Sequence, residues 1–392
     1  MEFESAAKAA ERLGVTVRAV QKWAKDGRLP GAKQLGRSWM IPADAQIPAS
    51  GTAIREIQSI RRHTPLPLLS TSFVPGHALE TAMAMEDEDE RAIALTEYYY
   101  FTGQVEPAVH TAEPYLEHSD PNLAMSAELL YIFANLSMGQ SELVRAGITR
   151  IRGRVTAALA TDEDSTLHAN AILFGAMASI VLHTTGSDAE SLKAVLPLLP
   201  PGLQLLGCYI LSCVAYLRKE YDYSRAIAEL ALAFGRDTYP LATNYLRMIL
   251  CMDLMCLRKT AEARECFNKL WSMAFPDGVI EPIGAHHLLL QGLPEICLKR
   301  QQPEQYKRLT VSSNRYSVAW QKLHQQSDER SAVNSLSLIE YAIAALYNRD
   351  WAVKEIALHM EMSERMIKHH ISMIYEKLGI SSREELRRKA RF

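Results

Sequence analysis

The sequence predicts a mainly α-helical protein: a helical-repeat solenoid flanked by two small helix-turn-helix units, the N-terminal one with a short β-hairpin wing. Apolar residues recur at helical spacing almost throughout residues 79–325, where polar breaks come at regular intervals. Short helix–turn–helix patterns occupy residues 1–47 and 336–392. Between the first of them and the repeats, residues 48–78 are rich in Pro, Ser and Thr. They predict a linker, with one short helix at 54–61.

The composition is that of a globular chain with several domains. Its 392 residues exceed what one hydrophobic core usually holds, and 48% of them are apolar against 22% charged. No apolar run is long enough to span a bilayer, and acidic residues stand where a signal peptide would carry positive charge. We therefore expect a cytoplasmic protein that has no membrane partner.

All six cysteines lie in apolar helical patterns, where a free thiol packs as a small hydrophobic group. They form no CxxC pair, and no histidine cluster lies beside them at zinc-ligand spacing. The six are Cys208, Cys213, Cys251, Cys256, Cys266 and Cys297. We expect them to be reduced core residues, and we expect the protein to use no metal and no cofactor.

The net charge of −2 is unevenly distributed along the chain. Residues 1–47 carry eight Lys or Arg against five Asp or Glu, and residues 336–392 carry ten against eight. The remaining residues, 48–335, therefore carry a net charge of −7. This distribution permits nucleic-acid binding at the two ends of the chain and argues against it in the middle.

Small residues recur early in the second helix of each predicted hairpin, at separations of 38, 43, 37 and 37 residues. They are Ala108, Ala146, Ala189, Ala226 and Ala263. The pattern resembles tetratricopeptide-type repeats, best at Tyr223-x-x-Ala226-x-x-x-Leu230 and Thr260-x-x-Ala263-x-x-x-Phe267. The resemblance implies stacked helical hairpins with a concave inner surface that binds peptides, proteins or small ligands. An irregular helical bundle is the alternative.

The C-terminal segment predicts four helices with clear local signals. The first two are expected at 338–347 and 353–360, and Ser363 stands where an N-cap opens a third helix at 364–378. An apolar stripe along that third helix consists of Ile367, Ile371, Ile374 and Leu378. Gly379 ends the helix, and Ser382 caps the fourth.

This segment resembles the LuxR-type helix-turn-helix in KEIA at 354–357, in SERMIKHHISMIYEKLGISSREEL at 363–386, and in Leu336, Ser337 and Glu340. The resemblance implies double-stranded DNA as a partner, and a homodimer formed through the fourth helix. It implies base contacts from Lys368, His369 and Ser372. It implies phosphate contacts from Lys354, Arg365, His370 and Lys377.

Two departures from the family pattern and one alternative accompany this resemblance. Met366 replaces the usual Thr, which removes a hydroxyl that could hold a phosphate. Asp350 and Trp351 replace the usual Gly-Leu before the second helix. The alternative is a four-helix cap of the repeats, although a cap does not require a cationic outer face.

The N-terminal segment predicts a helix at 4–13, a turn, a second helix over residues 17–25 with Thr16 as its cap, and two short strands around Gly36 and Arg37. It resembles the winged helix-turn-helix of excisionases and MerR-type regulators. The resemblance implies DNA contacts from Thr16, Arg18, Gln21, Lys22, Lys25, Lys33 and Arg37. The alternative is a helix-hairpin domain used for contact with another protein.

No catalytic constellation accompanies these modules. The sequence contains no G-x-x-x-x-G-K-[ST], G-x-G-x-x-G, G-x-S-x-G or HExxH motif, so no enzyme class is indicated. We interpret the chain as a DNA-binding transcription regulator whose repeats serve as a sensor, oligomerisation or partner-binding domain for a protein, peptide or small-molecule effector. The alternative is a repeat scaffold whose terminal modules do not bind DNA specifically.

Overall fold

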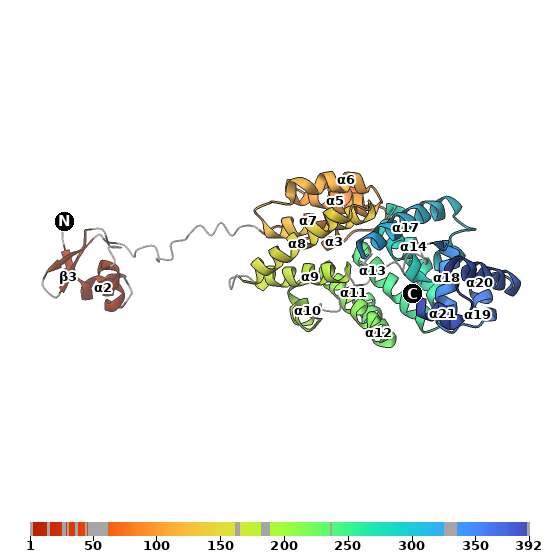
Figure 1. Cartoon of the computed structure of the whole chain (residues 1–392). Coiled ribbons are helices and arrows are strands. Elements are labelled where there is room, and N and C mark those ends of the chain that lie inside the picture. Colours follow the sequence, from red (N-terminus) through yellow and green to blue (C-terminus); the bar gives the residue numbers. More distant parts are fainter. Residues whose placement is uncertain are drawn as a thin grey trace. The chain divides into compact units, whose positions relative to one another are not determined.

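The computed structural model describes residues 3–13, 16–25, 29, 31–35, 38–43, 45, 62–160, 165–181, 189–235, 237–324 and 335–389 (Figure 1). The chain forms two compact units, Met1–Arg62 and His63–Phe392. The short helix expected at 54–61 lies outside the described residues. As expected, the fold is mainly α-helical, with a helical repeat region and a helix-turn-helix at each end.

The first unit is a helical pair packed on a small antiparallel sheet of order β1-β3-β2. Its elements are β1 (Phe3–Ser5), α1 (Ala6–Leu13), α2 (Val17–Lys25), β2 (Lys33–Leu35) and β3 (Ser38–Pro42). Ala9, Val20 and Ile41 are fully buried between helices and sheet. The expected hairpin is confirmed as β2 and β3, with Gln34 opposite Trp39.

The start of the first helix was predicted wrongly. Residues 3–5 form β1 rather than the first helical turn, and Glu4 pairs with Ile41 of β3. The Glu4 carboxylate accepts a hydrogen bond from Arg12 Nε at 2.8 Å, so the strand is also tied to α1. Three residues are too few to show the period of two that marks a strand in sequence.

The second unit begins with pairs of consecutive helices (Figure 1), and in four of these pairs a short turn of described residues joins the two helices. The pairs are α5 (Glu88–Phe101) with α6 (Val105–Ala112), α7 (Pro121–Ser137) with α8 (Ser141–Leu159), α9 (Ser165–Val181) with α10 (Ala189–Val195), α11 (Pro201–Leu217) with α12 (Tyr221–Gly235), and α13 (Pro240–Cys256) with α14 (Thr260–Ala274). Shorter elements are α3 (Pro67–Ser70), α4 (Ala78–Met83), α15 (Glu281–His286) and α16 (Leu293–Cys297), with η1 (Glu113–Tyr115), η2 (Leu196–Leu198), η3 (Phe275–Asp277) and η4 (His287–Leu290). A long helix, α17 (Pro303–His324), follows them.

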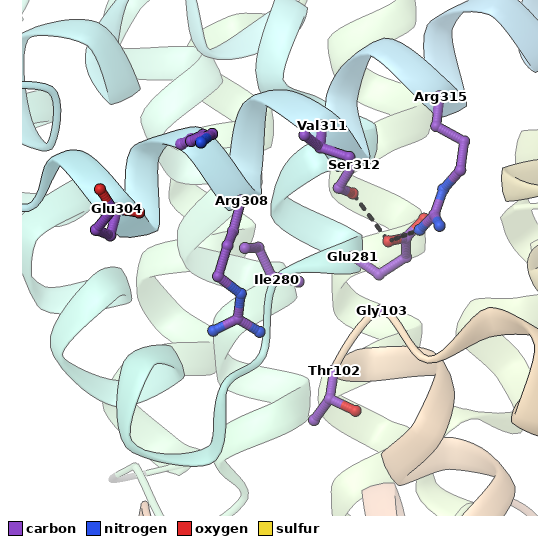
Figure 2. A pocket seen from close by; sticks show the side chains of 10 residues that line it. Thr102, Gly103, Ile280, Glu281, Glu304, Arg308, Val311, Ser312 and Arg315 are labelled. Carbon is purple, nitrogen blue, oxygen red and sulfur yellow. Dashed lines mark hydrogen bonds and ion pairs between the residues drawn. The ribbon is translucent and has the colours of Figure 1, made fainter.

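The concave inner surface expected of open repeats is covered by the chain itself. The helices α7, α11 and α13 are buried on nearly all sides. The long helix α17 packs against α7, α8 and α15, and α3 packs against α5, α11 and α13. Ser312 and Arg315 of α17 donate hydrogen bonds to the buried Glu281 carboxylate of α15, at 2.9 and 2.8 Å (Figure 2).

The second half of the expected linker belongs to this packed unit. The N–H groups of Leu68 and Leu69 donate to the carboxylate of Glu97, which is buried on α5. Burial raises the pKa of Glu97 to about 8, although these two hydrogen bonds act in the opposite direction. Because α3 is apolar and its backbone donors are satisfied, residues 63–70 fold with the repeats.

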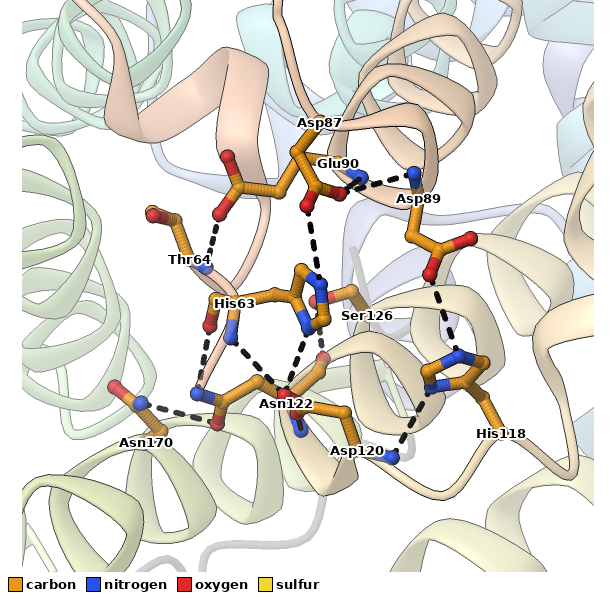
Figure 3. Close-up of polar contacts among 10 residues, drawn as sticks. All are labelled: His63, Thr64, Asp87, Asp89, Glu90, His118, Asp120, Asn122, Ser126 and Asn170. Carbon is orange, nitrogen blue, oxygen red and sulfur yellow. Dashed lines mark hydrogen bonds and ion pairs between the residues drawn. The ribbon is translucent and has the colours of Figure 1, made fainter. Parts of the chain in front are cut away.

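The segment that leads into α3 is held by polar side chains of α5, of α7 and of Asp120, the N-cap of α7 (Figure 3). His63 Nδ1 lies 2.8 Å from the buried Asp120 carboxylate, and the N–H of Thr64 donates to Glu90 at 2.7 Å. The N–H of Leu66 donates to Ser126 Oγ at 3.0 Å. Burial lowers the pKa of His63, but the hydrogen bond to Asp120 and the negative charges of Asp120, Asp87 and Glu90 together outweigh burial, so the pKa is raised overall. These contacts satisfy a backbone that has no regular secondary structure of its own.

Of the five predicted small residues, two are buried as the repeat register requires, two are exposed, and Ala189 is half-buried against the core. Ala108 and Ala263 are fully buried, as is Phe267, which confirms the match at 260–267. Ala146 and Ala226 are exposed, and the close contacts of α8 and α12 come from Gly147 and Ser224. The motif Tyr223-x-x-Ala226-x-x-x-Leu230 lies on an exposed face, with Tyr223 52% and Leu230 60% exposed. Neighbouring small residues in these helices make the packing face ambiguous in sequence.

The C-terminal part of the second unit contains α18 (Leu338–Asn348), α19 (Val353–Met360), α20 (Glu364–Leu378) and α21 (Arg383–Lys389). Ser363 and Ser382 accept hydrogen bonds from the first turns of α20 and α21, which confirms both caps. Gly379 ends α20 in the left-handed conformation, with φ 60°. All six cysteines are free, and each is buried or half-buried. Among the helices described here, none is both long and apolar enough to cross a membrane.

Four hairpins turn through the same backbone conformation. The residues at this position have φ of 79°, 76°, 64° and 61°, and each turn makes the same pair of backbone hydrogen bonds to the end of the preceding helix. They are Gly103, Gly139, Lys219 and Arg258. Glycine adopts this conformation without steric cost, whereas a lysine or arginine is strained there.

We expect Lys219→Gly to stabilise the protein by about 0.5–1 kcal/mol, because the relieved strain exceeds the extra entropy of glycine in the unfolded chain. Denaturant unfolding would measure the difference. Arg258→Gly is the matched control, because it relieves the same backbone strain but removes a side chain that contacts α19. A Lys219→Gly protein that is less stable than wild type would contradict the assignment of strain to this turn.

Candidate nucleic-acid interface

The helix α20 presents one polar face and one apolar face. Its buried side consists of Ile367, Ile374 and Leu378, with Ile371 half-buried. On the opposite side, four exposed side chains follow at i, i+3, i+4 and i+7, a spacing that places them along one stripe of a helix. They are Arg365, Lys368, His369 and Ser372. Three of the four carry cationic or hydrogen-bond-donating nitrogen groups, which suits DNA bases and phosphates.

The remaining predicted residues of this unit lie on α19 or on α20 outside the polar stripe. Lys354 is exposed in the first turn of α19. Met366, which stands where the family has a Thr, is 49% exposed beside the polar stripe and offers no hydroxyl. His370 and Lys377 lie outside the stripe, on one flank of α20.

Lys377 forms an ion pair that fixes α20 against α18. Its Nζ lies 2.9 and 2.6 Å from the two carboxylate oxygens of Glu340. Glu340 also accepts a hydrogen bond from the N–H of Ser337, in the capping box that opens α18. Burial acts to raise the pKa of Glu340, but Lys377 and Ser337 lower it overall. Lys377 therefore has a structural partner, and His370 beside it is half-buried with a pKa lowered by burial.

The second departure from the family pattern fits the backbone found here. Asp350 has a φ of 66°, the left-handed conformation that favours the usual Gly. Trp351 is buried and packs edge-on against the ring of His359. The Arg383 guanidinium lies 4.1 Å from the ring centre of Tyr347, and it donates a hydrogen bond to the Trp351 carbonyl at 3.1 Å.

The helix α2 of the N-terminal unit repeats the arrangement of α20. Val20 and Ala24 are buried, and four side chains on the opposite side are exposed at i, i+3, i+4 and i+7. They are Arg18, Gln21, Lys22 and Lys25. Thr16 is exposed just before α2, and Lys33 Nζ lies 5.5 Å from the ring centre of Phe3. Arg37 lies outside the described residues.

The C-terminal helix-turn-helix is packed on the helical repeats rather than separate from them. The Arg349 guanidinium lies 2.6 Å from Cys256 Sγ and 3.2 Å from the Tyr216 hydroxyl. Arg258 donates to Glu355 at 3.3 Å, and Arg264 donates to the His359 carbonyl at 2.6 Å.

A second set of contacts comes from the turn between η4 and α16. His359 is 3% exposed, and its Nε2 lies 3.0 Å from the Gln291 carbonyl. Gly292 has a φ of 88°, and a Cβ there would lie only 2.5 Å from Met360 Sδ. Sequence reasoning missed this interface because its partners lie 68 to 133 residues apart. The polar stripe of α20 stays exposed beside it.

A cavity of about 390 Å³ lies in the second unit between α17, the turn after α5 and the start of α15 (Figure 2). Its polar lining includes Thr102, Glu281, Lys307, Arg308 and Arg315. The lining mixes cationic and acidic groups, and none of these residues was singled out from the sequence.

Two family models match the chain at its ends. Residues 5–45 match the family described as helix-turn-helix domain, and residues 334–390 match bacterial regulatory proteins of the luxR family. No curated protein matches the chain. The chain therefore carries a helix-turn-helix domain at its N-terminus and a luxR-family helix-turn-helix at its C-terminus. These domains support a DNA-binding regulator.

The interface predicts a loss of stability in mild acid. Burial lowers the pKa of His359 from 6.5 to about 4, so the folded protein holds this ring neutral while the unfolded chain protonates it. Stability from this group is therefore complete above about pH 6.5 and is lost as the pH falls towards 4. Thermal unfolding between pH 7 and 4.5 should show a smaller decrease in Tm for His359→Asn than for wild type. Equal decreases would contradict this role of His359.

Proposed function

We propose that the protein is a transcription regulator that binds double-stranded DNA sequence-specifically through α20, aided by α2. The observation that carries this proposal is the polar stripe that α2 and α20 share. In both helices, four exposed polar residues with the same spacing lie opposite a buried apolar face. A helix of this kind can enter the major groove while its apolar side holds it on the domain.

The side chains of α20 suit two kinds of contact. Lys368, His369 and Ser372 offer donors and acceptors to base edges, which carry sequence preference. Arg365 on α20 and Lys354 on α19 offer cations to phosphates, which fix the register on the duplex. By the same reasoning Arg18, Gln21 and Lys22 of α2 contact DNA, with Lys25 near a phosphate.

Two DNA-binding domains on one chain bind two sites with increased avidity, because the second binding event occurs at a high effective concentration. The helical repeats then serve as the sensor or partner-binding part. The cavity beside α17 is a candidate for an effector site, because Lys307 and Arg308 line it together with the buried Glu281. A packed interface between repeats and α19 provides a route by which an effector alters DNA binding.

The direct experiment is binding of the full chain to a random-sequence duplex library at several salt concentrations. The proposal expects one enriched motif and an affinity that falls steeply as salt rises, because phosphate contacts release counterions. A library that shows no enrichment at low salt would instead favour the repeat scaffold without specific DNA binding.

Single substitutions test which of the two helix-turn-helix domains contacts which DNA site. We expect Lys368→Ala to reduce affinity for the enriched motif by about 10- to 100-fold, the range for loss of a good base contact. Arg18→Ala should reduce affinity for a second, linked half-site and leave the α20 motif unchanged. Each variant is the control for the other in a gel shift. A shift that neither substitution alters would contradict the assignment of both helices.

We also propose a homodimer formed through α21. Leu386 anchors this helix in the core, whereas Glu384 and Arg388 remain exposed one helical turn apart. In a two-fold interface the same patch meets itself, so Glu384 of one copy would lie opposite Arg388 of the other. Equilibrium sedimentation with and without DNA should show a dimer, and Arg388→Glu should weaken it. Only monomer under both conditions would contradict the proposal.

A further inference from the structure

We propose that the helical repeat region itself binds DNA, with Lys299 and Arg300 contacting backbone phosphates that flank the site of α20. This proposal rests on the proposed function, since it extends the surface that α20 presents. It also revises the expectation from charge that the middle of the chain stays away from nucleic acid.

The position of the two residues follows from the packing of the interface. They are separated from the end of α16 by one residue, and both are exposed. The same short helix begins beside Gly292, whose backbone approaches Met360 so closely that a side chain there would clash with it. The hydrogen bond between His359 and the Gln291 carbonyl holds this turn against α19. Lys299 and Arg300 are therefore carried on an element that is fixed relative to the helix-turn-helix.

Lys299 lies near enough to His370, on one flank of α20, for its charge to act on that ring. Its positive charge contributes to lowering the pKa of His370, together with the larger effect of burial and the charge of Lys377. His370 and Lys377 define the flank that adjoins the exposed stripe. When a recognition helix occupies the major groove, its flanks face the two phosphate backbones that wall the groove. A lysine beside such a flank is placed where phosphates lie.

Charge distinguishes this part of the repeats from the rest. Residues 291–324 carry six Lys or Arg against two Asp or Glu, within a region, 48–335, whose net charge is −7. One of the two acids, Glu295, is buried and lies 2.7 Å from His287, so it does not offset the exposed cations. Among the ion pairs of the described residues, none joins Lys299 or Arg300 to a carboxylate. Two exposed adjacent cations of this kind suit a polyanion.

The experiment compares two duplexes that carry the motif enriched from the random library. One ends at the motif, and the other continues on both sides by about ten base pairs, one helical turn, of arbitrary sequence. Wild type should bind the longer duplex more tightly. The double variant Lys299→Gln, Arg300→Gln should lose that gain, with roughly tenfold weaker binding at 50 mM salt and a salt slope smaller by about 2. Its sequence preference should be unchanged.

A second double variant, Arg145→Gln with Arg152→Gln, removes two positive charges from α8, which has no extensive packing against α18 to α21. It should bind the longer duplex as wild type does. The proposal would be overturned if the longer duplex increased affinity equally for wild type and for the Lys299 and Arg300 variant. It would also be overturned if both double variants lost the same amount of affinity for the longer duplex. Failure of the proposed function looks different, because wild type would then enrich no motif at all.

Discussion

The packing of the C-terminal helix-turn-helix on the repeats centres on a half-buried contact, that of Arg349 with Cys256 and Tyr216. The guanidinium extends from the end of α18 into the repeats, where a sulfur atom and a phenol oxygen receive its hydrogen bonds. A half-buried cation that loses these partners must find other hydrogen-bond acceptors, so this contact resists displacement. Arg258 and Arg264 act on the other side of the junction through α19. These three arginine contacts together pack the repeats against α18 and α19.

The same junction explains why one turn of the repeats has a strained arginine where other turns have glycine. The turns at Gly103 and Gly139 use glycine for their left-handed conformation, whereas the corresponding turn after α13 has Arg258. Its side chain donates to Glu355 and to the carbonyls of residues 349 and 350. The backbone strain is therefore offset by contacts to the helix-turn-helix. Lys219 occupies the equivalent strained position and makes no such contact among the described residues. Comparing substitutions at Lys219 and Arg258 therefore distinguishes the cost of the backbone strain from the stabilisation that the interface provides.

Local signals determined how much could be predicted from sequence. The bounds of α19 and α20 were predicted correctly, because Ser363, Gly379 and the stripe from Ile367 to Leu378 all act within one helix. The strand at residues 3–5 was missed because its partner, β3, lies more than thirty residues away. The exposed stripe of α20 could also be predicted, since helical spacing alone produces it. Lys299 could not, because only the packing of Gly292 against Met360 brings it beside α20.

The packing bears on the proposal that the cavity beside α17 binds an effector. A change in the position of α14, η4 or α16 reaches α19 directly, because Arg264 and Gln291 hydrogen-bond to it. The cavity beside α17 is lined by Glu281 of α15, and α15 packs against η4. A ligand that binds Glu281 of α15 would therefore be linked to α19 through two contacts, that of α15 with η4 and that of Gln291 with His359. The helix α19 in turn packs against α20. On the proposal that this cavity binds an effector, the contacts through η4 and α19 lead from the cavity to the C-terminal helix-turn-helix.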